Sequence, residues 1–353
     1  MVSTLSSPSG MVIAGVLVLL LVSVSVEAQL VNNFYDHTCP GAESIVNGIV
    51  RSRVKSDRTM AASLLRLHFH DCFVIGCEGS VLLDSTPGNT AEKDAGPNKN
   101  SLRGFDVIDQ IKSAVEGACP RVVSCSDIVA LAARDAIATI GGPTWKVPTG
   151  RRDGSLSLAS QAVADLPNPQ SSFAQLTKTF AAVGLNQKDL VVLSAAHTIG
   201  RAHCDGEVGR RLYNFPGTSD GIDPTLNKAY AKQLRKSCPP GSTNLVNMDP
   251  SLGGQTFDTN YYANLFNNRG LFHSDEVLLS DTTARGRVQA EINSPSTFNS
   301  DFAASMEKMG RIGVLTLSSP FQGEIRANCH RVNPKPKGSK TTTTKTAKKQ
   351  RKN

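Results

Sequence analysis

The chain has 353 residues, 39% of them hydrophobic, which is enough for a large globular protein with a buried interior. Its net charge of +8 comes from one end, because residues 334–353 hold eight of the 38 cations and no acid. The other 30 cations balance the 30 acids, which excludes a uniformly basic surface over the rest of the chain.

The N-terminal segment predicts export. Residues 11–22 form an apolar run, and Val26, Glu27 and Ala28 precede Gln29 in a pattern typical of signal-peptide cleavage. No Lys or Arg lies within residues 1–26, so the usual basic start is missing. A retained signal anchor is the alternative, but the run is short for a membrane-spanning helix and no basic flank follows it. We therefore expect a signal peptide at residues 1–28 and a secreted protein that is not held in a membrane.

The central part of the chain, residues 29–333, has the patterns of a mainly helical protein. Apolar spacing predicts helices at 57–72, 104–118, 124–138, 172–183, 186–194, 227–237, 260–267, 284–292 and 300–308. Strand signals are short and weak, and Gly, Pro and Asn mark the loops. We expect a mostly α fold in two lobes, followed by a basic, disordered tail at residues 334–353.

Eight cysteines in an exported chain predict four disulfides. They are Cys39, Cys72, Cys77, Cys119, Cys125, Cys204, Cys238 and Cys329. The sequence alone admits about 105 pairings. The Cys-Xaa2-Cys spacing that is typical of zinc clusters is absent.

The residue types that suggest chemistry lie at two places. Arg66 and His70 are four residues apart, so on a helix both lie on one face. A neutral imidazole can take and return a proton, and a guanidinium can stabilise a developing negative charge. His197 stands far downstream among small residues, where a large flat group could approach. This set is suited to cleaving a peroxide on a haem iron, with Phe69 as a wall of the site. A surface histidine with an ordinary ion pair is the alternative for either motif alone.

Two long motifs resemble those of the class III secretory plant peroxidases. Residues 61–77, AASLLRLHFHDCFVIGC, resemble the distal signature of that family, and residues 189–200, DLVVLSAAHTIG, resemble its proximal haem-ligand signature. The resemblance runs from Gln29 to Asn333. It implies a two-lobed fold with haem b between a distal and a proximal helical domain. It also implies a secreted, monomeric enzyme of the cell wall that reduces hydrogen peroxide while oxidising phenolic donors in one-electron steps.

The same resemblance implies roles for individual residues. Arg66 and His70 are the catalytic pair, Asn98 holds His70, and Glu92 orients Asn98. His197 is the axial ligand of the haem iron, and Asp275 accepts a hydrogen bond from its other ring nitrogen. The carbonyl of Pro167 is offered to phenolic substrates. The implied disulfides are Cys39–Cys119, Cys72–Cys77, Cys125–Cys329 and Cys204–Cys238.

Two calcium ions are also implied. The distal ligands are Asp71, Val74, Gly76, Glu78 and Ser80, and the proximal ligands are Thr198, Asp249, Ser251, Thr256 and Asp258. This chain has Glu78 where the family usually has aspartate, and the longer side chain is expected to weaken the distal site. The loop between Asp249 and Asp258 is one residue longer than usual, which makes Ser251 and Thr256 the least secure ligands.

Two other functions compete with this interpretation. The first is a metal hydrolase using His68, His70 and Asp71, but two histidines separated by one residue diverge on a helix and do not converge on one metal. The second is a non-catalytic wall protein that binds pectin or another polyanion through its basic tail. A nuclear localisation signal in that tail conflicts with the signal peptide and the disulfides, and a processed sorting peptide is a further alternative. No nucleic-acid partner is expected.

Overall fold

The structure is a computed structural model that describes residues 30–251 and 253–334. The predicted signal peptide and all but the first residue of the predicted tail lie outside these residues. Across the described residues, no helix is both long and apolar enough to cross a membrane.

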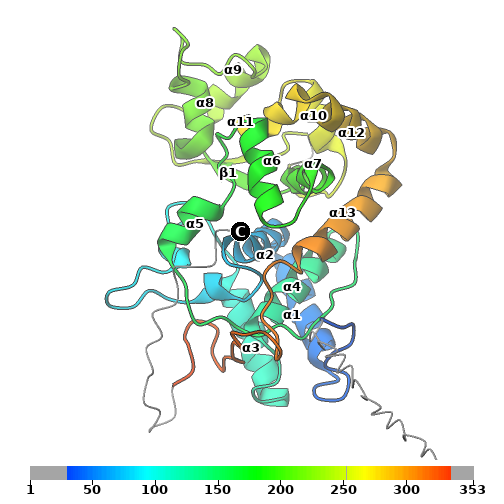
Figure 1. The fold of residues 1–353 in the computed structure, drawn as a ribbon. Helices are drawn as coiled ribbons and strands as arrows, with labels where there is room; N and C mark the ends of the chain where they lie inside the picture. The colour runs from blue at the N-terminus through cyan, green and yellow to red at the C-terminus, as the bar shows by residue number, and fades with distance from the viewer. Residues whose placement is uncertain (1–29, 252, 335–353) are drawn as a thin grey trace, which may run out of the picture.

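The described chain is mostly helical, as predicted (Figure 1). Its α-helices are α1 (Ala42–Ser56), α2 (Met60–Val74), α3 (Phe105–Ala118), α4 (Cys125–Thr139), α5 (Ala159–Asp165), α6 (Phe173–Ala182), α7 (Gln187–Ser194), α8 (Gly209–Tyr213), α9 (Lys228–Ser237), α10 (Asn260–Phe266), α11 (His273–Glu276), α12 (Thr282–Asn293) and α13 (Pro295–Met309). Two short strands, β1 (Arg201–His203) and β2 (Leu245–Asn247), pair antiparallel. Short 3-10 turns include η2 (Glu92–Asp94) and η3 (Ala195–Thr198).

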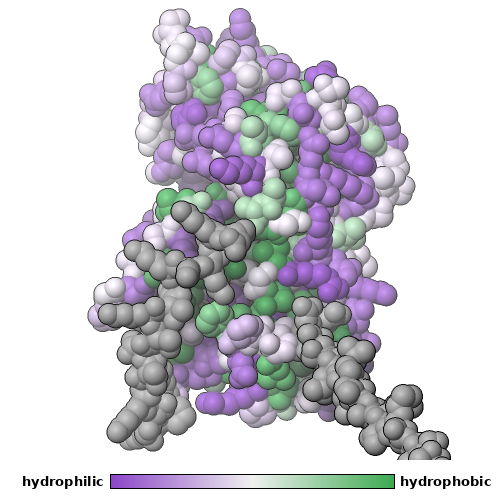
Figure 2. Space-filling view, viewed as in Figure 1, coloured by the Kyte–Doolittle hydropathy of each residue, from purple (hydrophilic) through white to green (hydrophobic). Residues whose placement is uncertain are grey.

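The helices form two lobes, with α1 to α4 in the lower part of Figure 1 and α6 to α12 in the upper part. Helix α13 runs between them and contacts α7. On the face shown in Figure 2, hydrophobic residues gather along the middle, below the mainly polar upper lobe. Helix α4 packs against α1, α2 and α3, and most of its residues are buried because alanines and branched aliphatic residues cover nearly its whole circumference.

All nine predicted helices are present, and two of them start three or more residues away from the predicted position. Helix α2 begins at Met60 and not at residue 57, because the carboxylate of Asp57 accepts the backbone N–H of Thr59 and forms a turn there. Helix α13 begins at Pro295, five residues before the predicted start, after the N-cap Ser294.

The short helices α5, α8 and α11 were not predicted, and neither was the longer helix α1. Its valines at 46, 50 and 54 are buried at a spacing of four residues, so the signal was present in the sequence but diluted by intervening polar residues.

The four implied disulfides are all formed. They join Cys39 to Cys119, Cys72 to Cys77, Cys125 to Cys329, and Cys204 to Cys238. The bridge between Cys125 and Cys329 ties the C-terminal segment to the start of α4. The same segment reaches the loop after α2, where Arg326 donates to the carbonyl of Gly79.

Candidate active site

The distal histidine is held by a turn that follows η2. His70 is buried in α2, and its Nδ1 lies 2.6 Å from Oδ1 of Asn98. The amide Nδ2 of Asn98 donates to the backbone carbonyl of Glu92 over 2.7 Å, which fixes the amide with its oxygen toward the histidine. The Nδ1 atom of a neutral His70 therefore carries the proton, and its Nε2 keeps a lone pair.

The electrostatic surroundings keep this imidazole neutral. Burial, together with the charge of Arg66, holds the pKa of His70 well below its ordinary value. Burial also lowers the pKa of Arg66 to about 10, so the guanidinium remains charged near neutral pH. The pair thus provides a neutral base beside a fixed cation.

The same turn positions Arg66. Its Nη2 donates to the carbonyl of Pro97 over 3.0 Å and to the hydroxyl of Ser101 over 3.1 Å. Pro97 and Asn98 are adjacent, so one turn sets the orientation of both Arg66 and His70. Phe69 lies edge-on to the His70 ring at a centroid distance of 5.0 Å, as expected for a wall residue.

The proximal histidine has a carboxylate partner. Nδ1 of His197 lies 2.7 Å from Oδ1 of Asp275, and the ring of Phe272 packs edge-on against the imidazole. The His197 side chain is 36% exposed, whereas Asp275 is buried. Within the described parts of the chain, Nε2 of His197 makes no hydrogen bond, so this atom can serve as a ligand.

Gly200 brings the distal and proximal segments together. A Cβ added there would lie 3.1 Å from Cβ of Ala62, and the positive φ of +99° also favours glycine. Ala62, Arg66 and His70 follow one another at intervals of four residues, so they share one face of α2. That face is therefore directed toward the segment that carries His197, with small side chains at the point of contact.

The predicted substrate residue lies at the edge of this region. Pro167 is half-buried just beyond α5. Two residues later, the carbonyl of Pro169 accepts the backbone N–H of Ser274 over 2.9 Å. The segment containing Pro167 is thus tied to α11, the helix that carries Asp275.

The predicted distal calcium ligands surround a buried acidic cluster. Asp71, Glu78 and Ser80 are all buried, and neither Oδ1 of Asp71 nor the Ser80 hydroxyl has a hydrogen-bond partner among the described residues. Burial raises the pKa of Asp71 to about 7 and that of Glu78 to about 8. Buried carboxyl groups with an unpaired oxygen on Asp71 fit a site for a divalent cation.

Glu92 takes part in two sites. Its backbone carbonyl orients Asn98, as described above, but its carboxylate points away to accept a hydrogen bond from Ser157. Burial and the neighbouring Asp71 raise the pKa of Glu92 to about 8. The side chain therefore belongs with the acidic cluster, and only the backbone serves the distal histidine.

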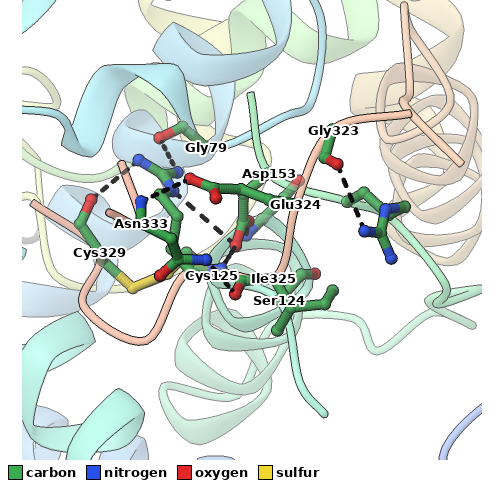
Figure 3. A network of polar contacts seen from close by, with 12 residues as sticks. Gly79, Ser124, Cys125, Asp153, Gly323, Glu324, Ile325, Cys329 and Asn333 are labelled. Atoms are coloured by element: carbon green, nitrogen blue, oxygen red, sulfur yellow. Dashed lines mark hydrogen bonds and ion pairs between the residues drawn. A yellow bond between two sulfur atoms is a disulfide. The ribbon is translucent and has the colours of Figure 1, made fainter. Parts of the chain in front are cut away.

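Arg326 supports the loop that forms this cluster, and Figure 3 shows its partners Gly79, Asp153 and Cys329 close together. The guanidinium is buried and donates to the carbonyls of Gly79 and Cys329 over 2.5 and 2.9 Å. Its backbone N–H donates to Asp153. The C-terminal segment thereby fixes the backbone of residue 79, between the predicted ligands at 78 and 80.

The predicted proximal calcium ligands are only partly brought together. The Thr198 hydroxyl lies 3.0 Å from Oδ1 of Asp258 and 3.5 Å from the carbonyl of Thr256. Asp249 is buried, and its charge helps to raise the pKa of Asp258, after the larger effect of burial. Ser251 is exposed, and the contact that links it to Asp249 runs through its backbone N–H.

Sequence reasoning missed several residues of the site. Ser101 holds Arg66, Arg326 supports the distal loop, and Tyr261 donates to Asp275 over 3.1 Å. These contacts join segments that are remote or irregular in the sequence, so no periodic signal marks them.

Comparison with known proteins agrees with this geometry. The family model described as Peroxidase matches residues 46–294. The chain is 51% identical to Peroxidase 5 of Vitis vinifera over 321 residues, which cover 90% of this chain and 96% of that protein. It is 49% identical to Peroxidase 3 of Arabidopsis thaliana, with 86% and 92% of the two chains covered. It is 48% identical to Peroxidase P7 of Brassica rapa subsp. rapa, with 86% and 100% covered.

These matches span both lobes and both histidine segments. They support peroxidase activity and do not favour the non-catalytic alternative. The chain belongs to the peroxidase family, as a class III plant peroxidase.

Proposed function

We propose that the protein is a secreted haem b peroxidase that uses hydrogen peroxide to oxidise small phenols. His70 and Arg66 would act on peroxide, and His197 would hold the haem iron. The observation that carries this proposal is the pair of oriented histidines. Asn98 is hydrogen-bonded to His70, and Asp275 is hydrogen-bonded to His197. When bound, haem supplies an iron centre that takes two oxidising equivalents from peroxide and passes them on singly.

On the distal side, the protein moves a proton and stabilises charge. The lone pair on Nε2 of His70 accepts the proton that peroxide loses and returns it to the departing oxygen. The Arg66 guanidinium stabilises the negative charge that builds on that oxygen. Asn98 prevents His70 from turning or changing tautomer, so the base does not have to reorganise during the reaction.

On the proximal side, the protein would control the electron density of His197, the residue that would hold the haem iron. Hydrogen bonding from Nδ1 to Asp275 gives His197 partial imidazolate character, which strengthens its donation through Nε2. Donors approach near Pro167, whose carbonyl can accept the hydroxyl of a phenol.

An absorption spectrum of the purified, haem-replete protein tests the proposal together with peroxide-dependent oxidation of guaiacol. We expect a Soret band with high-spin ferric features and guaiacol turnover. If His197→Ala fails to bind haem, His197 is assigned as the ligand of the haem iron. Normal haem binding by that variant would contradict the assignment.

We also propose that the acidic cluster binds one calcium ion and the Thr198–Asp258 region a second. The longer Glu78 fits the distal cluster because position 154 has no side chain. A Cβ on Gly154 would lie 2.3 Å from Oε1 of Glu78, and the backbone N–H of Gly154 donates to the Glu78 carbonyl. The space that the extra methylene needs is therefore provided by glycine.

Gly154→Ala is predicted to weaken calcium binding at the distal site roughly 10–100-fold, because the added methyl displaces the Glu78 carboxylate. Metal content after graded exposure to a chelator measures this change. Gly117→Ala is the matched control, since a Cβ there meets no atom within 4 Å. Adding Glu78→Asp to Gly154→Ala should restore part of the affinity. Equal calcium retention by Gly154→Ala and the unmodified protein would contradict the role given to this glycine.

The export signal and the basic tail suggest a place in the cell wall. Lys and Arg side chains of residues 335–352 can bind a polyanion such as de-esterified pectin. Asn333 is held by hydrogen bonds with Glu324, Ile325 and Ala327, so a chain that ends at residue 333 keeps this contact.

Removing residues 334–353 is predicted to lower the salt concentration at which the protein elutes from a polygalacturonate column. The attraction is between exposed charges and is screened over about 8 Å at physiological ionic strength. Guaiacol turnover is the control and should not change. Elution of both proteins at the same salt concentration would exclude the tail as the anchor.

A further inference from the structure

We propose that Tyr261 tunes the proximal histidine by sharing the carboxylate oxygen to which His197 is bound. This inference rests on the proposed role of His197 as the axial haem ligand. It concerns a residue that neither of the two sequence motifs contains.

The geometry places two donors on one oxygen. The hydroxyl of Tyr261 donates to Oδ1 of Asp275 over 3.1 Å, and Nδ1 of His197 lies 2.7 Å from the same atom. The other oxygen, Oδ2, accepts the backbone N–H of Phe272 over 2.8 Å. Asp275 therefore distributes its negative charge over three donors, of which His197 is one.

The environment makes the shared contact effective. Tyr261 and Asp275 are 3% and 1% exposed, so water does not screen the hydrogen bonds between them. Burial, with Asp275 as the next cause, raises the pKa of Tyr261 well above its ordinary value, which keeps the hydroxyl protonated as a donor.

The backbone next to Tyr261 is held at the start of α10. The carboxylate of Asp258 accepts the backbone N–H of Asn260 over 2.9 Å, immediately before Tyr261. The same Asp258 oxygen accepts the hydroxyl of Thr198, the neighbour of His197 in the sequence. The sequence neighbours of Tyr261 and His197, Asn260 and Thr198, are thus bound to one common carboxylate. Tyr261 and His197 themselves meet at Asp275, and their rings lie 6.1 Å apart.

The direction of the effect follows from competition for Oδ1. A second donor withdraws charge from this oxygen and weakens its hold on the N–H of His197. Without the Tyr261 hydroxyl, Asp275 would pull more strongly, and His197 would become more electron-rich. A more electron-rich axial ligand stabilises ferric over ferrous iron.

Tyr261→Phe in the haem-loaded protein tests this inference, with the ferric/ferrous midpoint potential as the readout. The substitution removes one oxygen and keeps the ring, so we expect haem binding to be retained. The potential should fall, with a roughly two- to tenfold higher ferric-to-ferrous ratio at fixed potential, the scale of one intramolecular hydrogen bond. Tyr262→Phe is the matched control, because that buried hydroxyl donates to the carbonyl of Val191.

Asp275→Asn separates this inference from the proposed function. That substitution alone should raise the potential, and adding Tyr261→Phe to it should then have little further effect. An unchanged or raised potential in Tyr261→Phe, with Asp275→Asn still raising it, would overturn the role of Tyr261 and leave the axial assignment intact. No change in either variant would overturn the role of Tyr261 and also the role of Asp275 as the partner that tunes His197. The iron–histidine stretching frequency gives a second measure, which should increase in Tyr261→Phe and stay constant in Tyr262→Phe.

Discussion

Replacing His70 by leucine is expected to leave haem bound and to slow the reaction with hydrogen peroxide roughly 10²–10⁴-fold. Leucine fills a similar volume in the buried face of α2 but cannot take a proton. The base is also lost next to Arg66, whose charge stabilisation is useful only when the proton has moved, so we expect the loss to reach the upper end of this range. Stopped-flow observation of the Soret band after mixing with peroxide measures the rate.

His37→Leu is the control for this variant. It makes the same chemical change on the exposed N-terminal segment and should leave the rate unchanged. A rate for His70→Leu within tenfold of the unmodified protein would show that another group accepts the proton. The rate for Asn98→Leu should lie between those of His70→Leu and the unmodified protein. This variant keeps the base, but nothing holds the tautomer of His70 any longer.

The distal pair was predictable because its geometry is local. Arg66 and His70 lie four residues apart on a helix, and helical periodicity alone places them on one face. The segment from Met60 to Val74 has strong apolar signals, so the helix itself was expected, to within three residues at its start. The four disulfides required more, since spacing left the pairing open and only the resemblance to a family chose among the alternatives.

Other features depend on contacts that no local pattern encodes. Gly154 lies 76 positions from Glu78, and nothing in the sequence indicates that its missing side chain makes room for the longer acid. The resemblance to the family predicts a weakened calcium site, and only the contact between Gly154 and Glu78 suggests that the longer acid is accommodated. Glu92 illustrates a second limit. The resemblance assigns one role to the whole residue, but its backbone carbonyl contacts Asn98 and its carboxylate contacts Ser157.

Tyr261 and Ser101 show the same limit for hydrogen bonds. Each is an ordinary polar residue in a short helix or a turn, and each is significant because of the atom that it reaches. The hydroxyl of Ser101 accepts a hydrogen bond from Arg66 and donates to the carbonyl of Pro97, which also binds that arginine. The turn at residues 97–101 therefore sets the position of the guanidinium as well as the tautomer of the base.

Replacing Arg66 by leucine is expected to slow the reaction with peroxide roughly 10²–10³-fold, the effect of removing one preorganised charge-stabilising donor. The variant keeps His70 and Asn98, so the proton can still move, but the departing oxygen loses its cation. Arg66→Lys should recover only part of the rate. Lysine restores a charge but not the planar fork that holds Pro97 and Ser101 while presenting other N–H groups to the oxygen.

The comparison of these two variants separates charge from orientation. Stopped-flow rates for Arg66→Leu and Arg66→Lys measure it, with Arg51→Leu on the exposed surface of α1 as the control. If lysine restored the full rate, the hydrogen bonds to the 97–101 turn would have no part in catalysis and a point charge would be sufficient. If leucine had no effect, His70 would act without a cationic partner. An intermediate rate for lysine would show that catalysis needs both the positive charge and the turn that orients it. One short segment, residues 97–101, then positions both the base and the cation.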